Sequence, residues 1–168
     1  MVEETGVQGE EMFANGADNM PQVGIISQYV KDLSFENPNS PAVYQWQVQP
    51  QIDVQFNISS NKAADDVWEV VLKVDVKAHG DQGVAFAVEL SYAGLFGIRN
   101  VPEDQIQPFC YAEAPRLIFP FARRVLADAV RDGGFPPLML EPIDFASLYM
   151  QQAQQAQQLG EGEPAGQA

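Results

Sequence analysis

Apolar and polar residues alternate with a period of two along three consecutive segments, and this pattern constrains the fold more than any other feature. In the first segment the apolar positions are Ile52, Val54, Phe56 and Ile58. The second segment covers residues 68–76 and the third covers residues 84–92. Such alternation places one face of a strand against a core. We therefore predict three strands, each with one apolar face.

A further strand is predicted over residues 23–35, which are rich in β-branched and aromatic side chains. It ends at residues 37–41, where asparagine and proline prevent a strand or helix from continuing. Polar turns are predicted over residues 59–66 and 79–83, so the last two strands form a hairpin. The four strands predict an antiparallel sheet. Its second face is mixed in polarity, which indicates partial cover, for example by another subunit.

Helices are predicted after the strands. Residues 118–130 carry apolar side chains at helical spacing, with arginines opposite. Gly133 and Gly134 are a typical helix end. Asp144 is placed to cap a final helix that runs into a glutamine-rich stretch, residues 151–158. Strands followed by helices indicate the α+β class.

The chain divides into a core domain and two polar ends. Residues 1–22 have several acidic side chains, no basic one and no apolar period, which predicts a disordered arm. The folded domain is expected over residues 23–150. Residues 151–168 are expected to form the glutamine-rich helix end and a flexible tail.

The charge and the cysteine content limit which partners, and which cellular compartment, are expected for this protein. The chain has 23 acidic and 9 basic residues, a net charge of −14. This balance argues against nucleic acid and favours a basic protein partner, although acidity can also serve solubility alone. Cys110 is the single cysteine, so no intrachain disulfide forms. The acidic start and the short apolar runs predict a cytoplasmic protein without membrane insertion.

Residue patterns for catalysis are missing from the sequence. His79 is the single histidine and is predicted to be solvated in a turn, while Ser91 lacks the glycines of a nucleophile elbow. No lysine follows a glycine-rich phosphate loop. No histidine is placed to activate Cys110, which is predicted to pack in a short helix after Pro102. We predict a binding protein that is not an enzyme, with no metal and no cofactor.

Four blocks of sequence, in this order, resemble the SecB family of bacterial protein-export chaperones. They are KDLSFENPN at 31–39, ADDVWEVVL at 64–72, LIFPFAR at 117–123 and GFPPLMLEPIDF at 134–145. The resemblance implies a four-stranded antiparallel sheet with helices packed on one side, assembled as a homotetramer of two dimers. It also implies binding of unfolded precursor proteins without ATP, and their delivery to the SecA motor.

The resemblance also assigns candidate site residues. For the SecA contact these are Asp32, Glu36, Ala87 and Glu89; at Ala87 the family has a larger aliphatic side chain. A groove for unfolded clients should use adaptable aromatic and apolar side chains. The candidates are Trp46, Phe86, Phe96, Met139, Tyr149 and Met150. Each of them could instead pack in the core, and Trp46 lies two positions earlier than the family pattern.

Other functions remain compatible with the sequence. The C-terminal tail could assist SecA contact, as in the family, or could simply aid solubility. A SecB-like chaperone could be dedicated to one client, such as a toxin–antitoxin system. A small-ligand carrier or enzyme using the concave side of the sheet is a further alternative, and so is a structural subunit whose apolar surfaces serve self-assembly.

Overall fold

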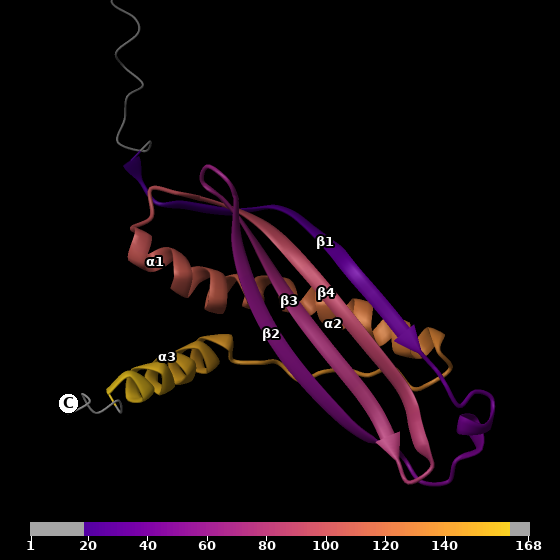
Figure 1. Cartoon of the computed structure of the whole chain (residues 1–168). Coiled ribbons are helices and arrows are strands. Elements are labelled where there is room, and N and C mark those ends of the chain that lie inside the picture. The colour runs from indigo at the N-terminus through magenta and orange to yellow at the C-terminus, as the bar shows by residue number, and fades with distance from the viewer. Residues whose placement is uncertain (1–18, 162–168) are drawn as a thin grey trace, which may run out of the picture.

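Four strands form a single antiparallel sheet in the computed structural model, which describes residues 19–161 (Figure 1). The strands are β1 (Gln22–Glu36), β2 (Gln51–Ala64), β3 (Val67–Gly80) and β4 (Gly83–Arg99). Their order across the sheet is β1-β4-β3-β2. Short turns join β2 to β3 and β3 to β4. The proline-containing segment 37–50 has to reach the opposite edge, because β1 lies beside β4.

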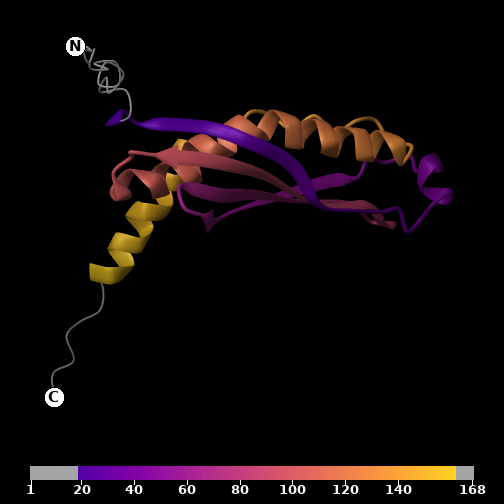
Figure 2. The same cartoon turned by 90° about the horizontal axis from the view of Figure 1, so that it is seen from above.

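Helices cover one face of the sheet. A continuous helical stretch contains α1 (Glu103–Pro108), a π-helical turn (Phe109–Glu113) and α2 (Ala114–Asp132). Seen from above, α2 lies along the sheet, whereas α3 (Phe145–Glu161) projects away from it (Figure 2). The predicted α+β fold, with strands first and helices afterwards, is confirmed, and so is the four-stranded antiparallel sheet with a helix on one face. The prediction that all C-terminal helices pack on this face is wrong for α3, which projects away from the sheet (Figure 2). Within residues 19–161, no helix is long and apolar enough to cross a membrane.

The core lies between α2 and the two central strands. Alternate residues of β3 and β4 point toward the helix and are almost fully buried, as period two requires. They meet the apolar stripe of α2. The large side chains of this layer that are fully buried include Leu72, Leu90, Phe96, Ile118 and Leu126.

The predicted turn over residues 59–66 is wrong in extent. β2 continues through these polar residues to Ala64, and only Asp65 and Asp66 make the turn. Ser59 pairs with Val71 and Asn61 with Glu69. The ladder uses backbone groups, so pairing with β3 overrides the weak strand preference of these side chains.

The predicted turn over residues 79–83 is also too long, and the last strand was predicted too short. His79 and Gly80 belong to β3, and β4 runs on beyond residue 92 to Arg99, where it pairs with the start of β1. His79 therefore lies in a strand and not in a turn, although its side chain, 37% exposed, remains partly solvated. Its Nε2 lies 2.6 Å from Oδ2 of Asp53 on the neighbouring strand β2.

The helix ends follow the predicted signals. α2 begins four residues before the predicted stripe and stops at Asp132, directly before Gly133. Asp144 caps α3, because its Oδ1 accepts a hydrogen bond of 3.0 Å from the backbone N–H of Ser147. This bond lowers the pKa of the Asp144 carboxyl. Most of the predicted N-terminal arm and the end of the predicted C-terminal tail lie outside the described residues.

Candidate functional site

The four residues assigned to the SecA contact lie together on the face of the sheet that α2 leaves uncovered. Glu36 of β1 is the direct partner of Ala87 on β4, while Asp32 pairs with Ser91 and Ser34 with Glu89. Glu89 is thus placed diagonally to both Asp32 and Glu36, a relation that separates residues by about 7–8 Å in an antiparallel pair. All three carboxylates are exposed. They form a compact group of negative charge, which we call the acidic face.

Two further carboxylates extend the acidic face across the sheet. Asp75 of β3 is the partner of Glu89, and Asp53 of β2 is the partner of Lys77. Both line a shallow hollow of about 550 Å³ together with Glu36, Ala87 and Glu89. The small Ala87 side chain leaves this hollow open where a larger aliphatic residue would fill it. A cationic segment of a partner could therefore lie against several carboxylates.

Positive charge within the acidic face is limited. Lys73 of β3 lies 3.8 Å from Oδ2 of Asp75, with both side chains well exposed, so the pair is weak. Lys77 lines the hollow itself. The surface therefore combines five carboxylates with two lysines, and its net charge attracts cations.

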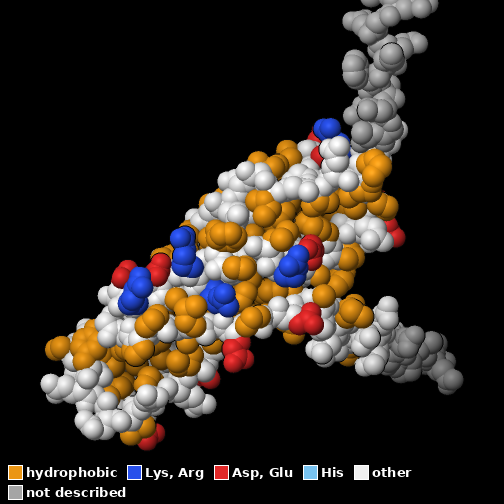
Figure 3. Space-filling model, turned by 180° about the vertical axis from the view of Figure 1, so that it is seen from behind, with side chains coloured by type: hydrophobic (Ala, Val, Ile, Leu, Met, Phe, Trp, Pro, Cys, Tyr) orange, Lys and Arg blue, Asp and Glu red, His pale blue; other side chains and the backbone are white. Residues whose placement is uncertain are grey.

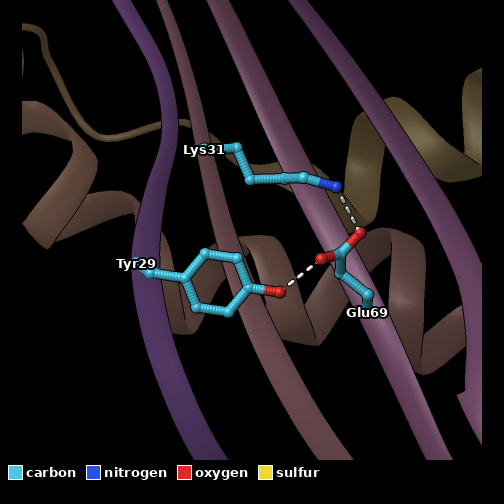
Figure 4. Close-up of polar contacts among 3 residues, drawn as sticks. All are labelled: Tyr29, Lys31 and Glu69. Carbon is cyan, nitrogen blue, oxygen red and sulfur yellow. Dashed lines mark hydrogen bonds and ion pairs between the residues drawn. The ribbon is translucent and has the colours of Figure 1, made fainter.

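A second polar cluster lies on the same face of the sheet, nearer the other end of β4. Lys31 Nζ is 2.8 Å from Oε1 of Glu69, and the Tyr29 hydroxyl donates to Oε2 (Figure 4). The ammonium of Lys31 and the tyrosine hydroxyl hold the pKa of the Glu69 carboxyl below its usual range. The same bond to Glu69, assisted by burial, raises the pKa of Tyr29 to about 12. The cluster keeps Glu69 ionised and ties β1 to β3 across β4.

The client-groove candidates on β4 lie in the core of the chain. Phe86 is buried and stacks with Phe35, ring centroids 6.0 Å apart, and with Phe135, 4.8 Å apart. Phe96 is fully buried and meets Phe109 edge to face. Both residues therefore pack in the core, which is the alternative that the sequence left open for them. They are ten residues apart on one strand, about 33 Å at the usual rise.

The remaining candidates are accessible but lie in different places. Tyr149 is half-buried on α3, where its ring stacks with Tyr111 at 6.1 Å. Met139 and Met150 are 62% and 60% exposed. Trp46 follows the 3-10 helix Ala42–Gln45 and packs partly against the core. The structure therefore does not bring the six candidates into a single small pocket.

Apolar side chains are also exposed along strand β1. Four apolar residues of β1 that point toward the helix side of the sheet stay 40–47% exposed, because α2 covers mainly the central strands; they are Val23, Ile25, Val30 and Leu33. Phe121 of α2 is exposed on the same side. Figure 3 shows this side of the molecule, where hydrophobic side chains lie between separated basic ones. Exposed apolar side chains that lie close together are typical of a surface that another polypeptide covers.

Several of these features escaped sequence reasoning. The period of two already placed Asp53 and Asp75 opposite the apolar positions of their strands, but only the pairing register brings them beside Glu89. The Glu69 cluster depends on the order of the strands, which places β4 between β1 and β3. No local pattern in the sequence encodes either relation.

Comparison with known proteins gives consistent results over almost the whole chain. The family model described as "Preprotein translocase subunit SecB" matches residues 16–156. The protein-export protein SecB of Zymomonas mobilis is 66% identical over 164 residues, covering 96% of this chain and 100% of that protein. The protein-export protein SecB of Sphingopyxis alaskensis is 62% identical over 172 residues, covering 100% of each chain.

A solved structure has the same fold at low sequence identity. It is a Mycobacterium tuberculosis SecB-like chaperone in complex with a peptide from an antitoxin. Its TM-score is 0.59 at 14% identity, and the match covers 72% of this chain and 90% of that one.

Proposed function

This chain belongs to the SecB family of protein-export chaperones, and from that premise we propose that it holds unfolded precursor proteins in the cytoplasm without nucleotide and delivers them to SecA. The observation that carries the delivery step is the acidic face. Glu89 lies diagonally between Asp32 and Glu36, on the sheet face opposite α2 (Figure 2). A small basic tail of SecA, of the zinc-bearing kind that the family binds, is complementary to this surface in charge.

The proposed holding step depends on exposed apolar surface. Trp46, Met139, Tyr149 and Met150 are accessible, and methionines adapt to many partners because their side chains are flexible. Phe86 and Phe96 would support such a surface from beneath. The separation of these residues favours a long client that spans several contacts, and an unfolded precursor meets that requirement.

Assembly into a homotetramer of two dimers is proposed on the apolar strip of β1 and on Phe121. These side chains are exposed in the single chain and would be buried against further copies. Light scattering of the purified protein should give the mass of four chains. A monomeric mass at micromolar concentration would contradict the proposal.

The holding step is tested by diluting a slowly folding precursor from denaturant in the absence of nucleotide. At one oligomer per precursor, the protein should suppress light scattering by the aggregating precursor. If it suppresses aggregation of none of several clients, a role in assembly alone becomes the better interpretation. A tight small-molecule ligand would instead favour a carrier.

The delivery step is tested by reversing the charge of Glu89. In Glu89→Lys, affinity for SecA should fall about tenfold at low salt, because the side chain faces the cationic partner directly. Glu141→Lys is the matched control: it makes the same charge change at an exposed position in the segment between α2 and α3. Equal affinities for the two variants would remove Glu89 from the contact.

A further inference from the structure

Lys31 precedes Asp32 in the sequence, yet its ammonium is bound elsewhere. A bulge in β1 between Val30 and Asp32 allows Lys31 to reach the same face of the sheet as Asp32. Its Nζ nevertheless bonds Glu69 on β3 (Figure 4). We propose that the Lys31–Glu69 pair keeps this lysine away from the acidic face and thereby sets the affinity of that face for a cationic partner. This inference rests on the SecA docking proposed above.

The Lys31–Glu69 pair holds the lysine ammonium at a distance from the carboxylates around Glu89. Glu69 is opposite Leu95 on β4, whereas Glu89 lies six residues further along the same strand. At about 3.3 Å per residue the two positions are about 20 Å apart along the strand. Surface charges this far apart are largely screened at physiological ionic strength, where the Debye length is about 8 Å. An ammonium held at Glu69 therefore compensates little of the negative charge around Glu89.

Glu69 is well suited to retain the lysine. Its side chain is only 17% exposed, and both carboxylate oxygens are occupied, Oε1 by Lys31 and Oε2 by the Tyr29 hydroxyl. The tyrosine can reach across β4 because its direct partner there is the small residue Ala93. Tyr29 thus fixes the orientation of the carboxylate that receives the ammonium. A partly buried pair of this kind is screened less than a fully exposed one.

A released Lys31 would have other carboxylates within reach. Asp32 is its neighbour in sequence, and Glu89 is diagonal to Asp32 on β4. The acidic face contains five carboxylates and two lysines, so a third lysine would reduce its net charge from −3 to −2. This loss of negative charge would weaken binding of a cationic peptide to the acidic face. The peptide that we propose is the basic tail of SecA.

The test compares four proteins for binding to the isolated zinc-bearing tail of SecA by calorimetry at low salt. Glu69→Gln frees Lys31 and should raise the Kd about three- to tenfold, the range expected when one charge moves into a partly solvated ionic contact. The double variant Lys31→Gln/Glu69→Gln has the net charge of the wild type and lacks the competing ammonium. Its Kd should lie within about twofold of the wild type. Tyr29→Phe keeps the ion pair and should also bind nearly as well as the wild type.

The pattern across variants separates this role from a structural one. If Glu69 only braces the sheet or touches the tail itself, the double variant should bind as weakly as Glu69→Gln, and the inference is overturned. Unchanged binding by Glu69→Gln also overturns it. If the wild type does not bind the tail, the docking proposal itself fails. Light scattering and circular dichroism on each variant establish that the fold and the assembly are unchanged.

Discussion

Replacing Gly133 with alanine tests how the end of α2 is fitted against β1. Gly133 has φ −75° and ψ 0°, a conformation that is allowed for alanine and common in type I turns, so the backbone itself does not exclude the substitution. A Cβ at this position would lie 2.2 Å from Cζ of Phe35 and 2.5 Å from its Cε1. The ring must therefore move, and it is stacked on Phe86 in the core.

The magnitude follows from two opposing effects. Overpacking of a filled site costs about 1–3 kcal/mol, while replacing glycine lowers the entropy of the unfolded chain and returns about 0.4–1 kcal/mol. The net destabilisation should be about 1–2 kcal/mol. For a chain of this length it corresponds to a fall in Tm of about 2–8 °C. The Gly133 carbonyl also accepts hydrogen bonds from Asn37 and from the Tyr44 hydroxyl, so the segment after β1 should loosen as well.

Urea unfolding followed by circular dichroism measures this effect, at one fixed protein concentration because association contributes to stability. Gly80→Ala is the control, since a Cβ there meets no atom within 4 Å. Phe35→Leu should relieve the clash, so the double variant with Gly133→Ala should lose less stability than the sum of the single variants. A Gly133→Ala protein as stable as Gly80→Ala, or additive free energies in the double variant, would show that the Phe35 ring does not restrict this position.

Further predictions concern the Glu69 cluster, the α3 anchor and the thiol. Because the pKa of Tyr29 is raised to about 12 from 10.0, its bond to Glu69 should stabilise the fold fully below pH 10 and lose this contribution as pH rises toward 12. The stability difference between wild type and Tyr29→Phe, measured by urea unfolding across that range, should shrink; a constant difference would contradict the assignment. Phe145→Ala should cost about 3–5 kcal/mol and increase hydrogen exchange in α3, because the ring is buried against Phe119; unchanged exchange would show that α3 is held by other contacts. Cys110 is buried, which raises the pKa of its thiol, so it should react with a thiol reagent only after unfolding; rapid reaction in the native protein would contradict its burial.

The spacing of apolar residues predicted most of the strands and helices, because this spacing shows which face of each element is buried. The alternation in β3 and β4 and the stripe of α2 each depend on nearby residues, so the elements and their inward faces could be read from the sequence. The boundary of β2 could not. Ser59 and Asn61 look like turn residues, and only the backbone ladder to β3 makes them part of a strand.

The candidate site was predictable in part for a similar reason. Resemblance to the family assigned Asp32, Glu36 and Glu89, and the register places them together. Phe96 shows the limit of the same approach, because an aromatic residue on a strand can serve a core or a groove, and burial alone distinguishes the two. The partner of Lys31 depends on which strand lies between β1 and β3, a property of the assembled sheet.

The most direct test of the proposed chaperone role is translocation of a purified precursor from a preformed complex with this protein into membrane vesicles that carry SecA and the export channel. The wild-type protein should keep the precursor competent for translocation, and the precursor should enter the vesicles when SecA is supplied with ATP. Glu89→Lys should keep the precursor soluble but slow its entry. Equal rates for wild type and Glu89→Lys would contradict delivery through the acidic face, and entry no faster than for precursor without the protein would contradict the chaperone role.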